Sequence, residues 1–233
     1  MPAMSLPTTG LTRTFGALAI AGAGLAACLA SGASAASPLP APRFDPPAHG
    51  PQVAVLSGGC FWGVQGVFEH VKGVRKVWAG YAGGKQATAN YELVSTGITG
   101  HAESVQVEFD PSQISYGQIL RIFFSVATDP TQLDRQFPDE GSQYRSEVFY
   151  QSPTQKAVAA RYIAQLAAAK AFPQPIATRV DPYTGFFRAE EHHQDYLVRH
   201  PTAPYIAIYD MPKIAHLRAE FPTAYRAEPN LAL

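Results

Sequence analysis

One short segment of the chain combines a cysteine with two aromatic residues and flanking glycines. Residues 58–63 read Gly-Gly-Cys-Phe-Trp-Gly, with Cys60 between a predicted strand at 53–56 and a predicted helix over about 60–72. A cysteine in the first helical turn lies near the positive end of the helix dipole, which favours the thiolate. The glycines permit a tight turn there. The segment therefore predicts a reactive cysteine beside Phe61 and Trp62; a buried cysteine with two core aromatic residues is the alternative.

Two further polar segments open predicted strands. Residues 97–103, Gly-Ile-Thr-Gly-His-Ala-Glu, end at Glu103, and the alternation that follows predicts a strand at 104–109. Residues 139–145, Asp-Glu-Gly-Ser-Gln-Tyr-Arg, precede a predicted strand at 146–150. Glycine-containing polar loops gathered at one end of a sheet are frequent places for a functional site. These polar segments therefore strengthen the interpretation of Cys60 as a reactive cysteine.

Other strands and helices must hold these segments together. Further strands are predicted at 74–81 and 177–180, and helices at 116–127, 154–170 and 188–199. The elements alternate without the strict order of a doubly wound fold. We predict an α/β fold (an α+β plait), in which one mixed, ferredoxin-like sheet with packed helices forms a single domain.

Composition excludes recognition by bulk charge. The 233 residues include 18 basic and 18 acidic side chains, so the formal net charge is zero. A nucleic-acid-binding protein typically carries a basic stripe, which this balance does not provide. We expect no nucleic-acid partner.

The amino-terminal segment has the features of an export signal. Arg13 precedes an apolar run at 15–29, and Ala-Ser-Ala at 33–35 fits a cleavage site. The run is short and rich in alanine and glycine for a membrane span. We predict a signal peptide over 1–35, a proline-rich linker over 36–51, a catalytic domain over 52–226 and a tail over 227–233. The protein is expected to be exported to the periplasm, with an uncleaved anchor as the alternative.

The second cysteine lies within this export segment. Leu-Ala-Ala-Cys at 25–28 has the form of a lipobox, so Cys28 is either removed with the signal peptide or lipidated. A membrane association is expected only in the second case. Either outcome leaves Cys60 as the single free thiol, which argues against a disulfide scaffold and for chemistry at that thiol.

Taken together, the motifs resemble those of the methionine sulfoxide reductase A family. Gly-Cys-Phe-Trp-Gly at 59–63, Gly-His-Ala-Glu at 100–103 and Gln-Tyr-Arg-Ser at 143–146 match its signatures in order. Tyr-Glu-Leu-Val at 91–94 and His-Gln-Asp-Tyr-Leu at 193–197 fall in the family's order too, and the resemblance covers about 53–225.

The resemblance implies that the protein reduces methionine S-sulfoxide to methionine. Cys60 would attack the sulfoxide sulfur, and Glu103 would protonate the oxygen. Proton transfer from a positioned acid accelerates a reaction by roughly 10²–10⁴-fold. The other roles that the resemblance implies are hydrogen bonding of the oxygen by Tyr91 and Tyr144, binding of the ε-methyl group by Phe61 and Trp62, orientation of the site by Asp139, and a weaker match at Tyr205. If Glu103 lies near Cys60 in a partly apolar pocket, its pKa should be raised and the pH profile should be bell-shaped.

One feature departs from many members of the family. Residues 205–233 contain no cysteine that could resolve an oxidised Cys60. A Cys60 sulfenic acid would therefore be reduced by an external thiol, either a thioredoxin-like protein or a small thiol. The expected substrates are oxidised proteins and peptides or free methionine sulfoxide, and the expected role is repair of oxidised exported proteins. We expect a monomer and no cofactor.

Three other interpretations compete with a reductase. A cysteine hydrolase would pair Cys60 with a histidine such as His101 or His193. A non-enzymatic lipoprotein binding module would need no reactivity at Cys60. The run Glu-Glu-His-His-Gln-Asp at 190–195 contains possible metal ligands, but adjacent histidines on a helix point about 100° apart, so no metal site is predicted there.

Overall fold

A six-stranded mixed sheet forms the centre of the protein. The computed structural model describes residues 39–233, so the predicted signal peptide and Cys28 lie outside the described residues. The strands of the sheet are β1 (Gln52–Gly58), β2 (Val74–Ala82), β3 (Ala102–Phe109), β6 (Ser146–Tyr150), β7 (Arg179–Pro182) and β8 (Phe186–Arg188), in the order β7-β6-β1-β3-β2-β8. All neighbours are antiparallel except β6 and β7.

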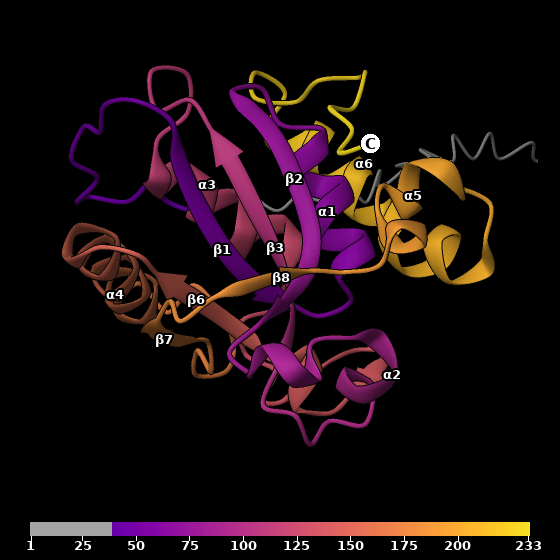
Figure 1. Cartoon of the computed structure of the whole chain (residues 1–233). Coiled ribbons are helices and arrows are strands. Elements are labelled where there is room, and N and C mark those ends of the chain that lie inside the picture. Colours follow the sequence, from indigo (N-terminus) through magenta and orange to yellow (C-terminus); the bar gives the residue numbers. More distant parts are fainter. Residues whose placement is uncertain (1–38) are drawn as a thin grey trace, which may run out of the picture. The chain divides into compact units, whose positions relative to one another are not determined.

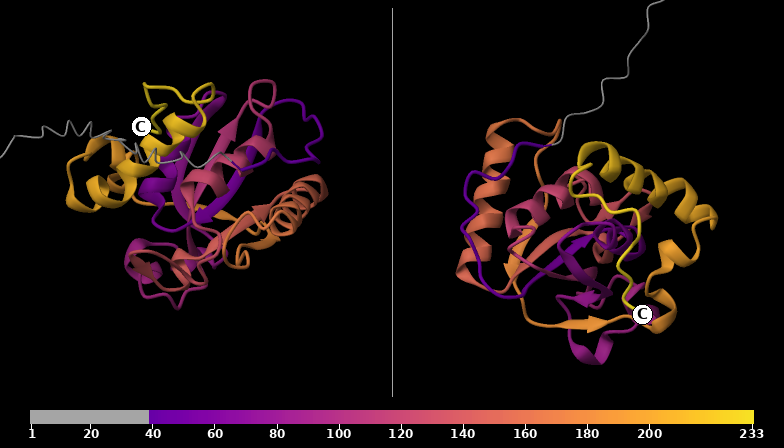
Figure 2. Two further views of the ribbon diagram at one scale, coloured as in Figure 1. Left: turned by 180° about the vertical axis from the view of Figure 1, so that it is seen from behind. Right: turned by 90° about the horizontal axis from the view of Figure 1, so that it is seen from above.

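The helices pack on this sheet and at its two ends. They are α1 (Phe61–Glu69), α2 (Tyr91–Val94), α3 (Tyr116–Ile122), α4 (Pro153–Ala168), α5 (Tyr196–Arg199) and α6 (Met211–Glu220). Helix α4 lies at the end of the sheet near β6 and β7, and α5 and α6 lie toward the opposite end (Figures 1 and 2). This arrangement confirms the mixed sheet with packed helices in a single domain.

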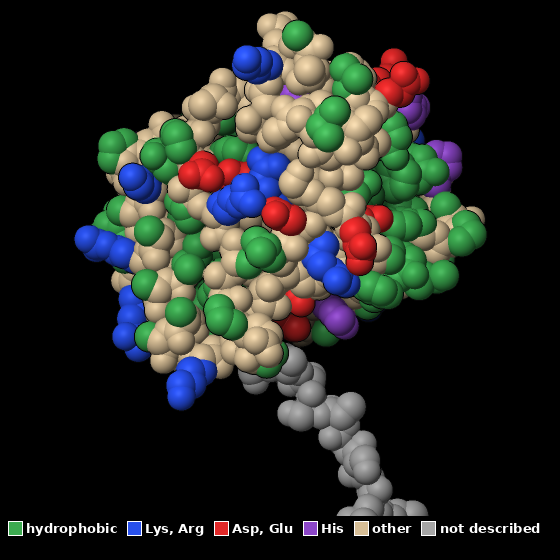
Figure 3. All heavy atoms as spheres, turned by 90° about the horizontal axis from the view of Figure 1, so that it is seen from below, with side chains coloured by type: hydrophobic (Ala, Val, Ile, Leu, Met, Phe, Trp, Pro, Cys, Tyr) green, Lys and Arg blue, Asp and Glu red, His purple; other side chains and the backbone are tan. Residues whose placement is uncertain are grey.

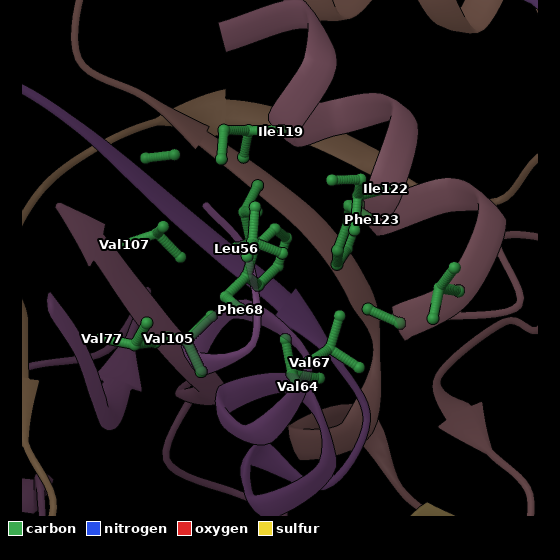
Figure 4. Packing of buried hydrophobic residues seen from close by; sticks show 14 of the residues in the cluster. Leu56, Val64, Val67, Phe68, Val77, Val105, Val107, Ile119, Ile122 and Phe123 are labelled. Atoms are coloured by element: carbon green, nitrogen blue, oxygen red, sulfur yellow. The ribbon is translucent and has the colours of Figure 1, made fainter. Parts of the chain in front are cut away.

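The core lies between the sheet and the helices α1 and α3. Leu56 of β1 and Val105 of β3 meet Val67 and Phe68 of α1, and Ile119 of α3 approaches from the other side of the cluster (Figure 4). All five side chains are fully buried. The preceding residue of β1, Val55, belongs to a separate small cluster with Ala82 and Phe149. This alternation follows from the two-residue period of a strand.

Two predicted helices differ from the observed elements. The helix predicted at 116–127 is α3 followed by a π-helical turn, Phe123–Ala127, which carries Phe123 into the core. The helix predicted at 188–199 is wrong. Its first residue ends β8, a 3-10 turn occupies Glu191–His193, and α5 spans only Tyr196–Arg199.

Pairing with β2 explains that second difference. Residues 186–188 form a ladder with β2, and the N–H of Ala189 continues it by donating to the carbonyl of Ala79. The buried Gln194 side chain then accepts from the N–H of Ala79 and donates to its carbonyl. These tertiary hydrogen bonds hold the backbone out of the helical conformation that the spacing of apolar residues suggested.

Both flanking segments contact the domain. The described part of the predicted linker has no helix or strand, and its carbonyls at Pro40 and Ala41 accept hydrogen bonds from Tyr162 and Gln165 of α4. In the predicted tail, the N–H groups of Ala232 and Leu233 donate to the Asp195 carboxylate at 2.7 and 3.1 Å.

The described surface mixes charged and apolar side chains. In the view from below, basic and acidic groups lie close together over the middle of the face and neither sign covers it (Figure 3). Over residues 39–233, the helices are all too short or too polar to span a bilayer.

Candidate active site

A tight turn between β1 and α1 places the cysteine. Gly59 adopts φ +96°, and a Cβ atom there would lie 2.6 Å from Cβ of Gln136. Only glycine combines that backbone conformation with so close an approach. Cys60 then caps α1 and is 8% exposed, with its side chain on the wall of a cavity of 350 Å³. The glycine turn that the sequence predicted is therefore confirmed.

Burial and the helix terminus act on the ionisation of Cys60 in opposite directions. Burial raises the pKa of the Cys60 thiol well above its ordinary value, and the carboxylates of Glu103, Asp210 and Asp139 raise it further. A hydrogen bond from the backbone N–H of Trp62 lowers it, as expected at a helix amino terminus, but does not outweigh burial. The predicted contribution of the helix terminus is therefore present, but desolvation dominates.

Glu103 lies directly beside the cysteine. It is the second residue of β3, pairs with Tyr81 of β2, and accepts a hydrogen bond of 3.0 Å from the backbone N–H of Phe61. Burial raises the pKa of Glu103 to about 8, with smaller contributions from Asp139 and Asp210, while the Phe61 hydrogen bond opposes the rise. The raised pKa that the sequence predicted is confirmed, and the side chain is protonated at neutral pH.

Three phenols and an aspartate complete the polar part of the site. Burial raises the pKa of Tyr91, Tyr144 and Tyr205, and Cys60 and Asp139 each raise these values further. Each hydroxyl is thus held protonated as a hydrogen-bond donor, and Tyr205 donates to the Asp139 carboxylate. Tyr91 begins α2, while Tyr144 ends a 3-10 turn after β5 (Asp139–Glu140), which pairs with β4 (Arg135–Gln136).

The aromatic part of the site is built around Trp62. Its ring stacks on Tyr196 at a centroid distance of 4.0 Å and meets Tyr205 edge-on at 6.0 Å. Its indole N–H donates to Nδ1 of His193 over 3.2 Å. Phe61 is fully buried and its ring lies 6.5 Å from that of Trp62. The structure therefore gathers the other seven predicted site residues around the Cys60 side chain.

Several positioning residues were missed. The Glu190 carboxylate accepts from the Tyr91 N–H at 2.9 Å and from the Tyr81 hydroxyl at 2.8 Å. The Arg145 guanidinium donates to the carbonyls of Gly100 and Ser142, joining the two polar loops that carry Glu103 and Tyr144. Glu190 and Arg145 both lie in polar segments that the sequence analysis describes. Nothing in those segments indicates which carbonyl or hydroxyl groups they contact.

The histidines make no hydrogen bond to Cys60. His193 is engaged by Trp62, and burial lowers the pKa of its imidazole to about 4, so it is neutral. His101 contacts the N–H of Gly84 and the carbonyl of Lys85. Within residues 39–233 neither ring reaches the sulfur as a hydrolytic base would need, and no three potential ligands are grouped to hold a metal ion.

Comparisons with known proteins agree with this geometry. A family model described as peptide methionine sulfoxide reductase matches residues 52–225. The chain is 53% identical over 186 residues to peptide methionine sulfoxide reductase MsrA 2 of Mesorhizobium japonicum, covering 80% of this chain and 95% of that protein. It is 49% identical over 181 residues to the MsrA 2 protein of Synechocystis, covering 78% and 85%. The crystal structure of reduced Mxr1 from Saccharomyces cerevisiae superposes with a TM-score of 0.59 at 30% identity, covering 66% of this chain and 87% of that one.

Proposed function

Because the chain belongs to the peptide methionine sulfoxide reductase family and is a peptide-methionine (S)-S-oxide reductase, we propose that Cys60 is the nucleophile that takes the oxygen from the substrate. The observation that carries this proposal is the placement of Cys60 next to a buried, protonated Glu103. The two side chains are linked through the backbone N–H of Phe61, which follows the cysteine and donates to the carboxyl group at 3.0 Å.

Loss of one proton from the pair of Cys60 and Glu103 prepares the site for reaction. The pKa of Glu103 is about 8, and that of Cys60 is above its ordinary value. The reactive form carries the thiolate and the protonated carboxyl group together. The Cys60 thiolate attacks the sulfoxide sulfur while Glu103 protonates the oxygen, which gives an adduct with a bond between Sγ and the substrate sulfur. The OH group then passes from the substrate sulfur to Sγ, and the S–O and sulfur–sulfur bonds of the adduct break. Methionine leaves, Glu103 is left ionised, and Cys60 holds the oxygen as a sulfenic acid.

Tyrosine hydroxyls stabilise the charge that develops on the oxygen. Tyr91 and Tyr144 have raised pKa values, so they remain neutral donors throughout the working pH range. A preorganised donor of this kind contributes roughly 10²–10³-fold to an acyl-transfer reaction, and a similar size is expected here. The same donors distinguish the sulfoxide from methionine, since methionine has no oxygen to accept from them.

The aromatic rings bind the methyl end of the substrate. The Trp62 ring stacks on Tyr196 and meets Tyr205 edge-on, and its N–H donates to His193. Burying one methyl group contributes only about 0.8 kcal/mol. The rings therefore orient the substrate, which selects the S epimer, and contribute little to overall affinity.

Regeneration of Cys60 uses external thiols. Cys60 is the one free cysteine among the described residues. A first thiol attacks the sulfenic acid, releases water and leaves a mixed disulfide; a second thiol attacks that disulfide, restores Cys60 and leaves as an oxidised pair. We propose a thioredoxin-like protein or a small thiol as the reductant, with repair of oxidised methionine in the periplasm as the role.

A single-turnover experiment tests this cycle. The full chain carrying Cys28→Ser is mixed with excess methionine S-sulfoxide in the absence of any thiol, and methionine is counted. We expect one methionine per enzyme, a mass increase of one oxygen atom at Cys60, and labelling of Cys60 by a sulfenic-acid reagent. Cys60→Ser is the control and should form no methionine. Continued turnover without thiol, or an unmodified Cys60 after one turnover, would contradict the proposal.

A further inference from the structure

An ion pair outside the predicted site faces the cysteine from α6. Lys213 Nζ lies 3.0 Å from Asp210 Oδ1, across one turn at the start of the helix. The Asp210 side chain is completely buried, whereas that of Lys213 is 26% exposed. Asp210 is the N-cap residue but makes no capping hydrogen bond, although aspartate favours that role. Its carboxylate is turned toward Lys213 and α1 instead.

The pair packs on the first turn of the helix that follows Cys60. A Cβ atom added at Gly63 would lie 2.1 Å from Asp210 Oδ1 and 2.8 Å from Lys213 Nζ. Glycine is thus required at position 63 for the pair to reach α1. Lys213 also lines the 350 Å³ cavity that contains Cys60. The second carboxylate oxygen, Asp210 Oδ2, is buried and has no hydrogen-bond partner among the described residues.

The charges around Cys60 are otherwise acidic or neutral. The acidic groups are Glu103 on β3, Asp139 on β5 and Asp129 on the cavity wall. The neutral groups are the phenols of Tyr91, Tyr144 and Tyr205 and the His193 imidazole, which accepts from Trp62. Of the described residues that line the cavity, Lys213 alone carries a positive charge. A buried carboxylate without a paired cation destabilises the folded protein far more than a buried carboxylate that is paired.

We propose that Lys213 sets the ionisation of Cys60 by neutralising Asp210, which is fixed against the first turn of α1. This inference rests on the proposed role of Cys60 as the nucleophile. With Lys213 in place, the pair presents almost no net charge to the sulfur. Without it, the Asp210 carboxyl group, whose pKa burial raises and Lys213 lowers, opposes the developing thiolate wherever it is ionised, because charges interact strongly in this buried medium. Lys213 acts on Cys60 through Asp210, as a positioning residue, and does not contact the substrate.

The test measures alkylation of Cys60 by iodoacetamide as a function of pH, in the full chain carrying Cys28→Ser. Alkylation reports the thiolate directly and does not depend on reductase turnover. The variants are Lys213→Met, Lys213→Arg, Asp210→Asn and the double variant. Arg218→Met, an exposed residue on the same helix, is the matched control.

We expect Lys213→Met to slow alkylation at neutral pH by about tenfold, the effect of a one-unit rise in the thiol pKa. Lys213→Arg should keep the wild-type profile. Asp210→Asn should accelerate alkylation, because it leaves the cation unpaired near the sulfur. Adding Asp210→Asn to Lys213→Met should restore the rate to within a few-fold of wild type.

A Lys213→Met profile that matches Arg218→Met at every pH would overturn the inference. So would a double variant that remains as slow as Lys213→Met, since the defect would then be structural. Failure of the proposed function is a separate result, because it would appear as sulfoxide reduction that survives Cys60→Ser, whatever the alkylation profile.

Discussion

Replacement of Glu103 by glutamine tests the acid that the site is built around. A carboxyl group with a pKa of about 8 is about 90% protonated at pH 7, against about 0.3% for the ordinary value of 4.5. Burial therefore keeps the Glu103 carboxyl group protonated in nearly all molecules, so that it can donate its proton to the sulfoxide oxygen. Glutamine preserves the size of the side chain and cannot transfer that proton. We expect kcat/KM to fall by roughly 10²–10⁴-fold, or about 2.7–5.5 kcal/mol of transition-state stabilisation.

The shape of the pH profile adds a second readout. In the wild type, the reactive form has one proton shared between Glu103 and Cys60. Activity should rise as the pair loses its first proton near pH 8 and fall as it loses the second, above the ordinary thiol pKa. In Glu103→Gln the falling limb should disappear and the rising limb should follow the Cys60 thiol alone.

The assay measures kcat/KM for a blocked methionine S-sulfoxide from about pH 5 to about pH 10, a range that spans both limbs of the profile. Dithiothreitol is the reductant. Glu108→Gln, on the same strand, is a control that should leave the profile unchanged. A Glu103→Gln enzyme that keeps the wild-type rate and both limbs would refute the role of Glu103 as the acid.

Three further predictions concern other parts of the fold and site. Tyr91→Phe and Tyr144→Phe should each lower kcat/KM by roughly 10²-fold, because each removes one donor to the sulfoxide oxygen; unchanged kinetics in both would remove the tyrosines from the mechanism. Arg145→Gln should lower the free energy of unfolding by about 3–5 kcal/mol in urea, because it leaves Glu147 buried without its cation. That loss should shrink in acid, where the Glu147 carboxyl group is protonated, and a pH-independent loss would contradict this account. Leu56→Ala should cost about 2–5 kcal/mol in the same assay, since Leu56 is fully buried in the main core.

Strand β3 and the turn after β1 can be predicted from the pattern of neighbouring residues in the sequence. The alternation of Val105, Val107 and Phe109 predicts β3, and those side chains do face the core. Glycines around Cys60 predict the turn at the end of β1, and the positive φ of Gly59 requires one of them. Such features depend on neighbours along the chain, so the order of residues contains the information needed.

The parts that were missed depend on contacts between distant segments. The predicted helix at 188–199 fails because Gln194 hydrogen-bonds to Ala79 in β2. The helix terminus favours the Cys60 thiolate as predicted, but the local sequence does not indicate that the fold buries the sulfur beside carboxylates from β3, β5 and the start of α6. The place of Asp210 and Lys213 beside the site cannot be predicted from the sequence, since an aspartate three residues before a lysine is an ordinary pattern on an exposed helix. Only the fold reveals that this pair packs on Gly63.

Reduction of the two separate epimers of a blocked methionine sulfoxide, by the Cys28→Ser chain and by its Cys60→Ser derivative, tests the central claim most directly. With dithiothreitol as the reductant, our account predicts turnover of the S epimer alone, and complete loss of that turnover in Cys60→Ser. Equal reduction of both epimers would contradict the orienting role of the Trp62 pocket. Persistent reduction by folded Cys60→Ser would show that the oxygen is not transferred to Cys60.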